Sequence, residues 1–187
     1  MTRDEMLLKM PKGLVCAEVG VLNGDFSRKI LDITKPEWLF LIDPWGEQAV
    51  EIYQDAANVD QVRQDARYNR VIGRFYEDKN VSIMRGYSYD ELKNQCDLDW
   101  VYIDGNHSYD AVTEDLEIAK ESIKQTGFIA GHDYAESARD GTKFGVIEAV
   151  TEFMRRNPDF KLRFLSDERW ATYILSRHEL PWLWCDK

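Results

Sequence analysis

Two apolar runs of the sequence each end in side chains that can bind a metal ion or transfer a proton. The run "VYIDGNHSYD" delivers Asp104 and His107, and the run "GFIAGHDY" delivers His132 and Asp133. Carboxylates are ligands for hard divalent cations, and an imidazole acts either as a ligand or as a general base near neutral pH. The chemistry of these four residues therefore depends on whether the elements that carry them are neighbours in the fold.

A glycine-containing turn after an earlier apolar run is the second feature with chemical meaning. In "AEVGVLNGDFS", Glu18 ends the run, Gly20 and Gly24 follow, and Asp25 to Ser27 are good caps for a helix. Glycine tolerates positive φ and lets a ligand approach the backbone closely, and the first turn of a helix offers free N–H groups. In a doubly wound sheet, nucleotide-like cofactors lie at this first strand-to-helix turn.

The spacing of the glycines separates the cofactor classes. A dinucleotide fingerprint requires G-x-G-x-x-G, whereas Leu22 stands where its middle glycine would be, and no lysine follows that would form a phosphate-binding loop. The carboxylate of Glu18 suits a cationic ligand better than a pyrophosphate. The next apolar run ends in "LIDPW", which places Asp43 where an acid can bind both ribose hydroxyls. The alternative interpretation is that this loop binds no cofactor and is the ordinary glycine turn of any α/β protein.

Short apolar runs and helical patterns alternate along the chain and must position these residues. The runs are β-rich and continuous, as strands buried on both faces are. They cover 14–19, 38–43, 81–85, 100–104 and 127–131. Between them, the clearest helical stripe closes at Gly127, and its apolar residues are Tyr109, Val112, Leu116, Ala119 and Ile123. Further helices are expected before Pro36, from about Asn58, and before Asn157-Pro158.

The last part of the chain has a different pattern. Two successive strands, 161–166 and 170–176, are joined by the turn-like "DER". Alternation of strand and helix followed by a hairpin predicts an α/β, doubly wound, mostly parallel sheet with an antiparallel addition at its end. We expect residues 1–187 to form a single domain. The tail tryptophans Trp182 and Trp184 are expected to dock on the body of the domain or on a second subunit, which would form a homodimer.

Charge and cysteine content exclude several classes of function. With 34 acidic residues against 24 Lys and Arg, the formal charge is −10, which disfavours nucleic acid and anionic membranes as partners and leaves a small molecule as the expected one. Cys16, Cys96 and Cys185 form no C-x-x-C pair, so neither a zinc motif nor a disulfide framework is expected. No segment has the apolar length of a signal peptide or a membrane span, and a cytoplasmic location is the expectation.

At this point the sequence resembles a known family. The segments that carry the resemblance are, in order, "EVGVLNGDFS", "LIDPW", "RGYS", "YIDGNHSYDAVTEDL", "GFIAGHDY" and "GVIEAVTEF". Over residues 14–176 they resemble the class I S-adenosylmethionine-dependent methyltransferases, and most of all the small O-methyltransferase-like group found beside sugar and natural-product pathways. The resemblance implies a Rossmann-like methyltransferase fold with a seven-stranded sheet and a reversed last strand.

The resemblance also implies a cofactor, S-adenosylmethionine, and residues that would bind it. The methionine end of the cofactor would be lined by Glu18, Gly20 and Gly24. Asp43 would hold the ribose, and the "RGYS" segment would lie beside the adenine. The full set of expected cofactor-binding residues is Glu18, Gly20, Asn23, Gly24, Ser27, Asp43, Gly86, Tyr87, Ser88 and Asp104. Leu22 departs from the family's E-x-G-x-G-x-G pattern, which affects the path of the loop.

In the topology that the resemblance implies, Asp104 and Asp133 end adjacent parallel strands, which lie about 4.8 Å apart. Two carboxylates that close repel each other unless a proton or cation lies between them, and a divalent ion such as Mg²⁺ resolves this. Such an ion would orient substrate oxygens and lower the pKa of a hydroxyl group, with His107 as the base and Asp104 as its catalytic partner. Asp104, His132 and Asp133 are the expected metal ligands.

The macrolide sugar O-methyltransferases are similar in having an Asp-x-x-His element followed by an acidic pair. Here His132-Asp133 replaces that pair. Either His132 is a third ligand, which favours Mn²⁺ or another transition ion, or only the aspartates bind the metal. Purely structural roles are the competing interpretation: Asp104 as a helix cap, His107 as a helix-terminal residue bonded to backbone, and His132 as a neutral core histidine.

The resulting hypothesis is an S-adenosylmethionine-dependent methyltransferase that methylates an oxygen of a small hydroxylated substrate, such as a sugar or a phenol, with metal assistance. An NAD-dependent sugar oxidoreductase and a non-catalytic binding or assembly subunit with the same fold are the alternatives. The acceptor pocket is expected in the variable segments 44–79 and 134–144, whose sequences contain no motif that identifies the acceptor.

Overall fold

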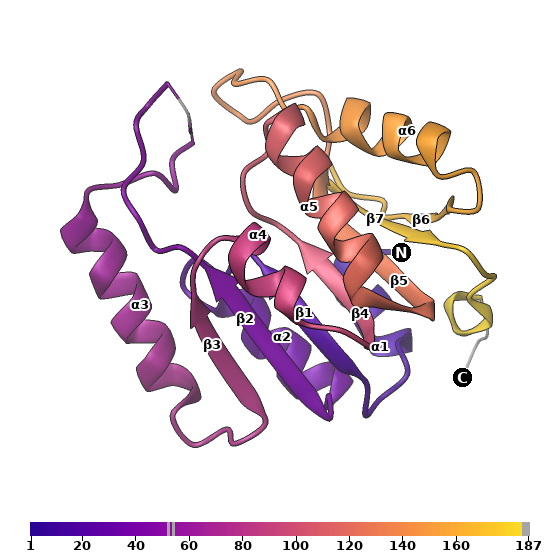
Figure 1. Ribbon diagram of the computed structural model, residues 1–187, viewed down its shortest axis with the longest axis horizontal. Coiled ribbons are helices and arrows are strands. Elements are labelled where there is room, and N and C mark those ends of the chain that lie inside the picture. The colour runs from indigo at the N-terminus through magenta and orange to yellow at the C-terminus, as the bar shows by residue number, and fades with distance from the viewer. Residues whose placement is uncertain (52, 54, 185–187) are drawn as a thin grey trace.

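The computed structural model describes residues 1–51, 53 and 55–184, so Cys185 lies outside the described residues. In this part of the chain, one seven-stranded sheet is flanked by helices on both faces (Figure 1). The strands are β1 (Val15–Val19), β2 (Trp38–Asp43), β3 (Val81–Arg85), β4 (Leu98–Ile103), β5 (Ile123–Tyr134), β6 (Lys161–Leu165) and β7 (Ala171–Ser176). The helices are α1 (Arg3–Lys9), α2 (Asp25–Thr34), α3 (Gln61–Phe75), α4 (Ser88–Glu91), α5 (Tyr109–Ser122) and α6 (Val146–Arg156), with 3₁₀ turns at Leu92–Asn94 and Pro181–Leu183.

The strand order is β3-β2-β1-β4-β5-β7-β6, and the first five strands in this order are parallel. The last strand of the chain, β7, is antiparallel to both of its neighbours, β5 and β6. The predicted fold class, a doubly wound and mostly parallel sheet with an antiparallel last strand, is therefore confirmed. The order reverses beside β1, so the loops after β1 and β4 open a crevice at the carboxyl ends of these strands.

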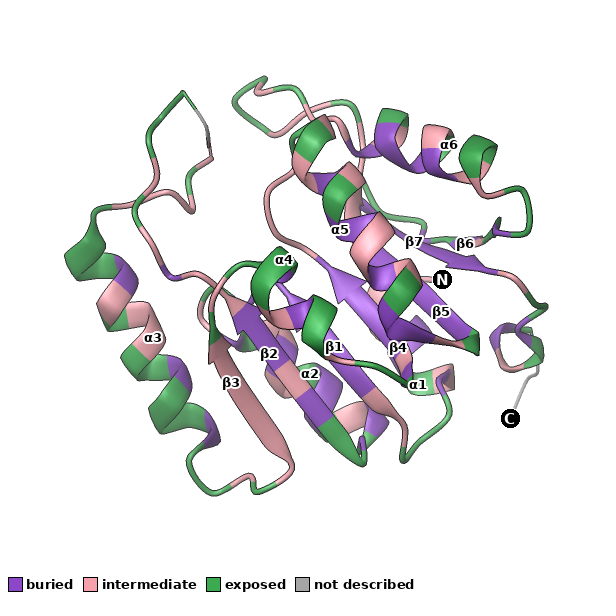
Figure 2. Ribbon diagram, viewed as in Figure 1, coloured by how far each residue is buried: buried purple, intermediate pink, exposed green. Residues whose placement is uncertain are grey.

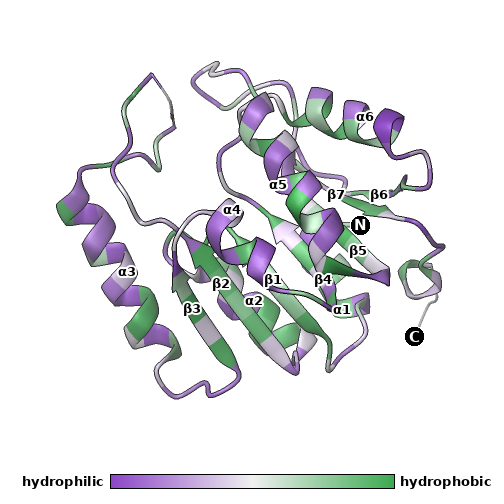
Figure 3. Ribbon diagram, viewed as in Figure 1, coloured by the Kyte–Doolittle hydropathy of each residue, from purple (hydrophilic) through white to green (hydrophobic). Residues whose placement is uncertain are grey.

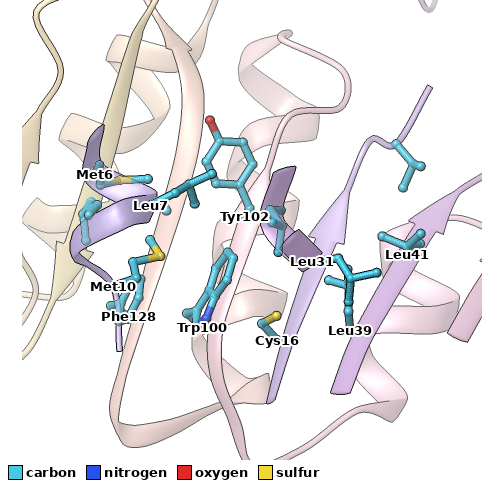
Figure 4. Close-up of a cluster of buried hydrophobic side chains, with 14 of the residues drawn as sticks. Met6, Leu7, Met10, Cys16, Leu31, Leu39, Leu41, Trp100, Tyr102 and Phe128 are labelled. Carbon is cyan, nitrogen blue, oxygen red and sulfur yellow. The ribbon is translucent and has the colours of Figure 1, made fainter. Parts of the chain in front are cut away.

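Two hydrophobic cores lie on the two faces of the sheet. Helices α1, α2 and α3 cover one face, where Met6, Leu7 and Met10 pack over the stacked rings of Trp100 and Phe128 (Figure 4). Helices α5 and α6 cover the other face with a second cluster. The central strands are accordingly buried and apolar along most of their length, whereas the edge strand β3 is only half-buried (Figures 2 and 3). Buried central strands of this kind position their carboxyl ends rigidly.

The structure differs from the sequence expectation at two elements. Helix α5 ends at Ser122 and β5 begins at Ile123, whose backbone is extended, whereas the apolar stripe predicts a helix that continues to Gly127. The side chain of Ile123 is buried in either conformation, so periodicity alone does not separate them. Helix α1 was not expected at all. A capping box between Thr2 and Glu5 starts it, and its apolar side chains complete the core.

The two tail tryptophans behave differently. The ring of Trp182 lies 5.5 Å from that of Phe128, so this residue docks on the body of the domain. Trp184 is 67% exposed. None of the helices in the described part of the chain combines the length and the apolar character that a membrane crossing requires.

Candidate functional site

A cavity of about 550 Å³ opens at the carboxyl edge of the sheet, where the loops after β1, β2, β3 and β4 meet. Eight of the ten expected cofactor-binding residues line it, together with His107: Glu18, Gly20, Asn23, Asp43, Gly86, Tyr87, Ser88 and Asp104. The cavity therefore brings together the glycine turn, Asp43 after β2, and Asp104 and His107 after β4. Gly24 and Ser27 are absent from its walls, and their places in the structure explain why.

The two glycines of the first turn have different tasks. Gly20 has φ +88°, and a Cβ there would lie 2.1 Å from the backbone oxygen of Asp104. It is glycine because the loop after β1 and the end of β4 touch at this point. Gly24 has φ +74°, and a Cβ there would lie 2.9 Å from the ring of Phe75. Gly24 therefore allows α3 to pack behind the loop, and the loop itself, with Leu22 at φ +53°, faces the cavity.

Glu18 is a buried carboxylate in the cavity wall. It is 1% exposed, and its Oε2 has no hydrogen-bond partner. Burial raises the pKa of Glu18 well above its ordinary value, and the hydroxyl of the fully buried Ser27 opposes this increase. Ser27 therefore lies near Glu18 but outside the cavity wall. An acceptor atom without a partner in a cavity wall fits a ligand that brings a donor or a positive charge.

Asp43 organises the glycine turn. Its Oδ2 accepts hydrogen bonds from the backbone N–H groups of Val21 and Leu22, both at 2.9 Å, and its Oδ1 accepts one from the N–H of Trp45 at 2.7 Å. Burial raises the pKa of this carboxyl, and these three bonds oppose the shift. Oδ2 thus already accepts two bonds, whereas Oδ1 accepts one and can accept a second, so Asp43 keeps some acceptor capacity for a ligand. Its expected contact with a ribose stays a prediction.

The segment after β3 forms another wall of the cavity. Gly86 donates its N–H to the carbonyl of Asp43 at 3.2 Å, and the rings of Tyr87 and Tyr89 stack with their centroids 5.1 Å apart. Ser88 donates its hydroxyl to Asp115 of α5, and burial raises the pKa of Asp115 to about 6. Sequence reasoning missed Asp115. The signal was available, because this acid stands next to Leu116 on the apolar stripe of α5.

The two polar clusters meet, as the sequence predicts. Ligand atoms of Asp104, His107 and Asp133 all lie within 4.8 Å of one another. The Nε2 atom of His107 is 3.0 Å from Oδ2 of Asp133 and 3.6 Å from Oδ1 of Asp104. Burial works against a charge on this imidazole, but the surrounding carboxylates outweigh it and raise the pKa of His107 to about 11. In turn, His107 and His132 lower the pKa of Asp133, although burial opposes them.

His132 belongs to the edge of this cluster. Its Nδ1 lies 3.0 Å from Oδ2 of Asp133 and 3.8 Å from Oδ1 of Asp104. Asp133 itself has φ +53°, a left-handed conformation that is costly for a residue with a side chain, at a break in the pairing of β5 with β7. This local irregularity therefore lies where the carboxylate of Asp133 faces the end of β4.

Three residues in contact with the cluster were missed by sequence reasoning. Asp55, in the loop between β2 and α3, has its Oδ2 3.5 Å from Nδ1 of His107. Arg3 of α1 has its Nη1 3.4 Å from Oδ2 of Asp104. The ring of Phe144, from the loop after β5, lies 4.8 Å from that of His107. Segments 44–79 and 134–144 therefore do reach the cluster, in the place where we expect an acceptor.

The donor set fits a divalent cation. Both ring nitrogens of His107 are buried without a hydrogen bond of acceptable geometry, although carboxylate oxygens lie within 3.0 to 3.6 Å. Carboxylate oxygens that converge around poorly aligned ring N–H groups form a site in which a divalent cation could take the place of the ring protons. Asp104 and Asp133 would hold the ion, with His107 or His132 as a nitrogen ligand.

Comparison with known families agrees with this geometry. Residues 17–134 match the model of a methyltransferase domain, and the chain belongs to that family. The match covers the glycine turn, Asp43, and both halves of the polar cluster. It favours the methyltransferase hypothesis over an NAD-dependent oxidoreductase. No curated protein sequence matches the chain.

Solved structures show the same fold at low sequence identity. Spermidine synthase from Thermotoga maritima is 12% identical, with a TM-score of 0.62 over 96% of this chain and 58% of its own. Precorrin-6y C5,15-methyltransferase from Geobacter metallireducens is also 12% identical, with a TM-score of 0.62 over 92% and 84% of the two chains. Aeropyrum pernix fibrillarin, solved with S-adenosyl-L-methionine bound, is 9% identical, with a TM-score of 0.59 over 88% and 67%. The chain thus has the fold of the class I methyltransferases and spans little more than half the length of the spermidine synthase it matches.

Proposed function

We propose that this protein is an S-adenosylmethionine-dependent methyltransferase that methylates a hydroxyl oxygen of a small acceptor, such as a sugar or a phenol, with the help of a divalent cation. The observation that carries the proposal is the position of Asp104. This residue lines the cavity of the glycine turn and also belongs to the cluster with His107 and Asp133. A donor site and an acceptor-activating site would therefore share one residue.

Each partner group supplies a distinct part of the chemistry. S-adenosylmethionine carries a methyl group that is already activated by its sulfonium charge. A bound divalent ion lowers the pKa of a hydroxyl and orients oxygen ligands. The cavity residues have the complementary task of alignment, which accounts for much of the rate in a transfer between two bound reactants.

The residues of the chain divide this alignment between them. Asp43 holds the glycine turn in shape through Val21 and Leu22, so the cavity wall is pre-formed. Asp104 and Asp133 hold the ion at the ends of adjacent strands. A divalent ion between Asp104 and Asp133 would offset the carboxylates that raise the pKa of His107. The neutral imidazole would then accept the proton of the acceptor hydroxyl if it is not itself a ligand, and Asp55 faces its second ring nitrogen at 3.5 Å.

The acceptor class is proposed from the same cluster. An ion bound by only two or three side chains keeps open positions for two substrate oxygens, which favours neighbouring hydroxyl groups on a sugar or on a phenol ring. Imidazole at 3.0 Å from Asp133, from either His107 or His132, makes a transition ion such as Mn²⁺ a better candidate than Mg²⁺.

A two-stage experiment tests the proposal. Calorimetry first measures binding of S-adenosylmethionine, and absence of both heat and a thermal shift would refute the donor assignment. A screen with radiolabelled S-adenosylmethionine then covers sugars, catechols and polyketide scaffolds, with Mn²⁺, with Mg²⁺ and with a chelator. Label that appears in a hydroxylated acceptor and is lost with the chelator supports the proposal. Label transferred equally well with the chelator would remove the metal from it.

A further inference from the structure

Two arginines stack on the ring of one tryptophan, Trp170. Arg139 comes from the segment between β5 and α6, and Arg169 comes from the turn between β6 and β7 (Figure 1). Their guanidinium carbons lie 5.1 Å and 4.9 Å from the centroid of the indole ring. The two charges are therefore within about 10 Å of each other, close to one Debye length at moderate salt. Like charges at this separation repel each other, and an anion bound to both would relieve the repulsion. We call Arg139 and Arg169 the arginine pair.

The arginine pair has no acidic partner. Among the arginines that the structure describes, only these two form neither a hydrogen bond nor an ion pair through the guanidinium. The acids beside them in the sequence are bonded elsewhere. Oδ1 of Asp140 accepts a hydrogen bond from the N–H of Thr142 at 3.0 Å. Oε2 of Glu168 accepts one from the N–H of Arg3 at 2.7 Å. Both arginines are exposed, so their donors are open to a ligand from solvent.

The ring between the two arginines is held in place. Nε1 of Trp170 donates to the carbonyl of Ser137 at 3.1 Å, which ties the turn between β6 and β7 to the segment after β5. That segment is itself a short hairpin. Ser137 and Lys143 form an antiparallel bridge, and the N–H of Ala138 donates to the carbonyl of Thr142 at 2.9 Å. The two arginines therefore project from backbones whose relative position is fixed.

The arginine pair lies close to the polar cluster of the candidate site. Trp170 directly precedes Ala171, and Ala171 pairs with Tyr134 of β5. Tyr134 directly follows Asp133, one of the expected metal ligands. Two residue steps of a strand cover about 7 Å. The stacked ring therefore lies only about two residue steps along the sheet from a carboxylate of the cluster.

The hairpin also contacts the histidine of the cluster. The ring of Phe144 lies 4.8 Å from that of His107, and the N–H of Gly145 donates to the carbonyl of His107 at 2.8 Å. His107 and Asp104 line the donor cavity, whereas neither Phe144 nor the arginine pair belongs to its wall. The cluster thus has the donor cavity on one side and the hairpin on another. An acceptor whose hydroxyl reaches the cluster would lie against the hairpin, near the arginine pair.

We infer that the arginine pair binds an anionic group of the acceptor, so that phenolic carboxylates or sugar phosphates are preferred over neutral phenols and sugars. The inference rests on the proposed function, because it assigns the acceptor of that reaction. A guanidinium has five N–H donors and binds carboxylate or phosphate oxygens through two parallel bonds. The half-buried ring of Trp170 adds an apolar surface beside these donors. Arg139 and Arg169 are then specificity-determining residues.

The first experiment locates anion binding in the absence of a methyl donor. Proton–nitrogen NMR on the full chain follows the indole N–H signal of Trp170, assigned with Trp170→Phe, while inorganic phosphate is added at constant ionic strength. In the wild type, this signal should shift and reach saturation. In the double variant Arg139→Gln, Arg169→Gln, phosphate should bind about 10- to 100-fold more weakly, the range for hydrogen bonds between charged groups.

A second double variant is the matched control. Lys79→Gln, Lys161→Gln removes the same amount of charge from two exposed positions. Lys79 precedes β3 and Lys161 begins β6, so both lie at the amino edge of the sheet, away from the arginine pair. Phosphate should shift the Trp170 signal in this variant as it does in the wild type.

The second experiment tests whether the arginine pair recognises the acceptor. Catechol and protocatechuate differ by one carboxylate, and glucose and glucose 6-phosphate differ by one phosphate. Calorimetry measures the binding of all four compounds to the wild type and to both double variants. In at least one of the two sets, the anionic compound should bind about 10- to 100-fold more tightly than the neutral one, and this preference should vanish in the arginine variant. The set that shows it distinguishes a carboxylate from a phosphate acceptor.

The possible failures are distinguishable. If phosphate leaves the Trp170 signal unchanged, or shifts it equally in the arginine variant, the pair binds no anion and the inference is wrong. If phosphate binds there but neither anionic compound is preferred through the arginines, the pair is not part of the acceptor site, and the inference is also wrong. If the wild type binds no S-adenosylmethionine, the proposed function fails and the acceptor assignment falls with it, whereas the phosphate response of Trp170 does not depend on the donor.

Discussion

The backbone oxygen of Asp104 occupies the space that a side chain at Gly20 would need, since a Cβ at Gly20 would lie 2.1 Å from it. The turn after β1 and the end of β4 are therefore locked together, and with them the proposed donor and metal sites. Gly20→Ala should lower the free energy of unfolding by about 2 to 4 kcal/mol, from overpacking plus a left-handed backbone, and should abolish binding of S-adenosylmethionine. Denaturant unfolding and calorimetry measure the two effects.

Gly13 provides the control for this substitution. It also has positive φ, +75°, but a Cβ there would meet nothing within 4 Å. Gly13→Ala should cost only the backbone term, about 1 to 2 kcal/mol, and leave donor binding intact. Equal effects of the two substitutions would show that contact between the loop and β4 does not matter.

Asp104 and Asp133 are expected to share one metal ion. Asp104→Asn and Asp133→Asn should each weaken Mn²⁺ binding and lower kcat by about 100-fold or more, because each removes a charged ligand. Manganese titration and a methyl-transfer assay give the two values. Asp32→Asn, which changes an exposed acid paired with Arg28, should affect neither. Wild-type metal dependence in either ligand variant would contradict the shared site.

Asp55 is expected to position His107 rather than to bind the donor. A carboxylate near Nδ1 fixes which nitrogen of the ring carries the proton and how the ring is oriented, and loss of such a partner costs about 10- to 100-fold in activity or metal affinity. Asp55→Asn should therefore lower kcat in this range with an unchanged Kd for S-adenosylmethionine. Glu51→Gln, an exposed acid of the same loop, is the control and should behave as the wild type. A weaker affinity for S-adenosylmethionine with an unchanged kcat would contradict this role, because Asp55 would then belong to the donor site.

Asp115 should make stability depend on pH. Burial raises its pKa from 3.8 to about 6, so the folded state holds the proton more tightly than the unfolded state does. Its stabilising contribution is present below about pH 4 and is lost as the pH rises to about 6, a loss of about 3 kcal/mol. Asp115→Asn keeps a neutral partner for Ser88 and should be more stable than the wild type at pH 8, with the difference vanishing near pH 4.

Urea unfolding at several pH values measures this effect. Glu121→Gln changes an exposed acid at the end of the same helix and should show no comparable pH dependence. An Asp115→Asn variant that is less stable than the wild type at pH 8 would contradict the assignment. Asp115 also lines the cavity. If the more stable Asp115→Asn variant binds S-adenosylmethionine more weakly, Asp115 contributes to donor binding at a cost in stability.

The sequence predicts the sheet and the meeting of Asp104 with Asp133, because both features follow from strand order and from where buried strands end. It does not predict Arg3 or Asp55. Arg3 contacts Asp104 across 101 positions of the chain from an unexpected helix, and Asp55 reaches His107 from an irregular loop. Neither segment has a periodicity that fixes a direction for its side chains. Gly24 and Ser27 fall in the right motif, but in the structure they lie outside the cavity wall.

The central claim is that one cavity holds the methyl donor next to a metal bound by Asp104 and Asp133. Relaxation of the S-methyl protons of bound S-adenosylmethionine, measured by NMR with Mn²⁺ on the protein, tests it directly. The account predicts strong broadening of the methyl signal in the wild type, and none in the Asp104→Asn, Asp133→Asn double variant. A sharp methyl signal from wild-type protein that demonstrably binds both S-adenosylmethionine and Mn²⁺ would contradict it.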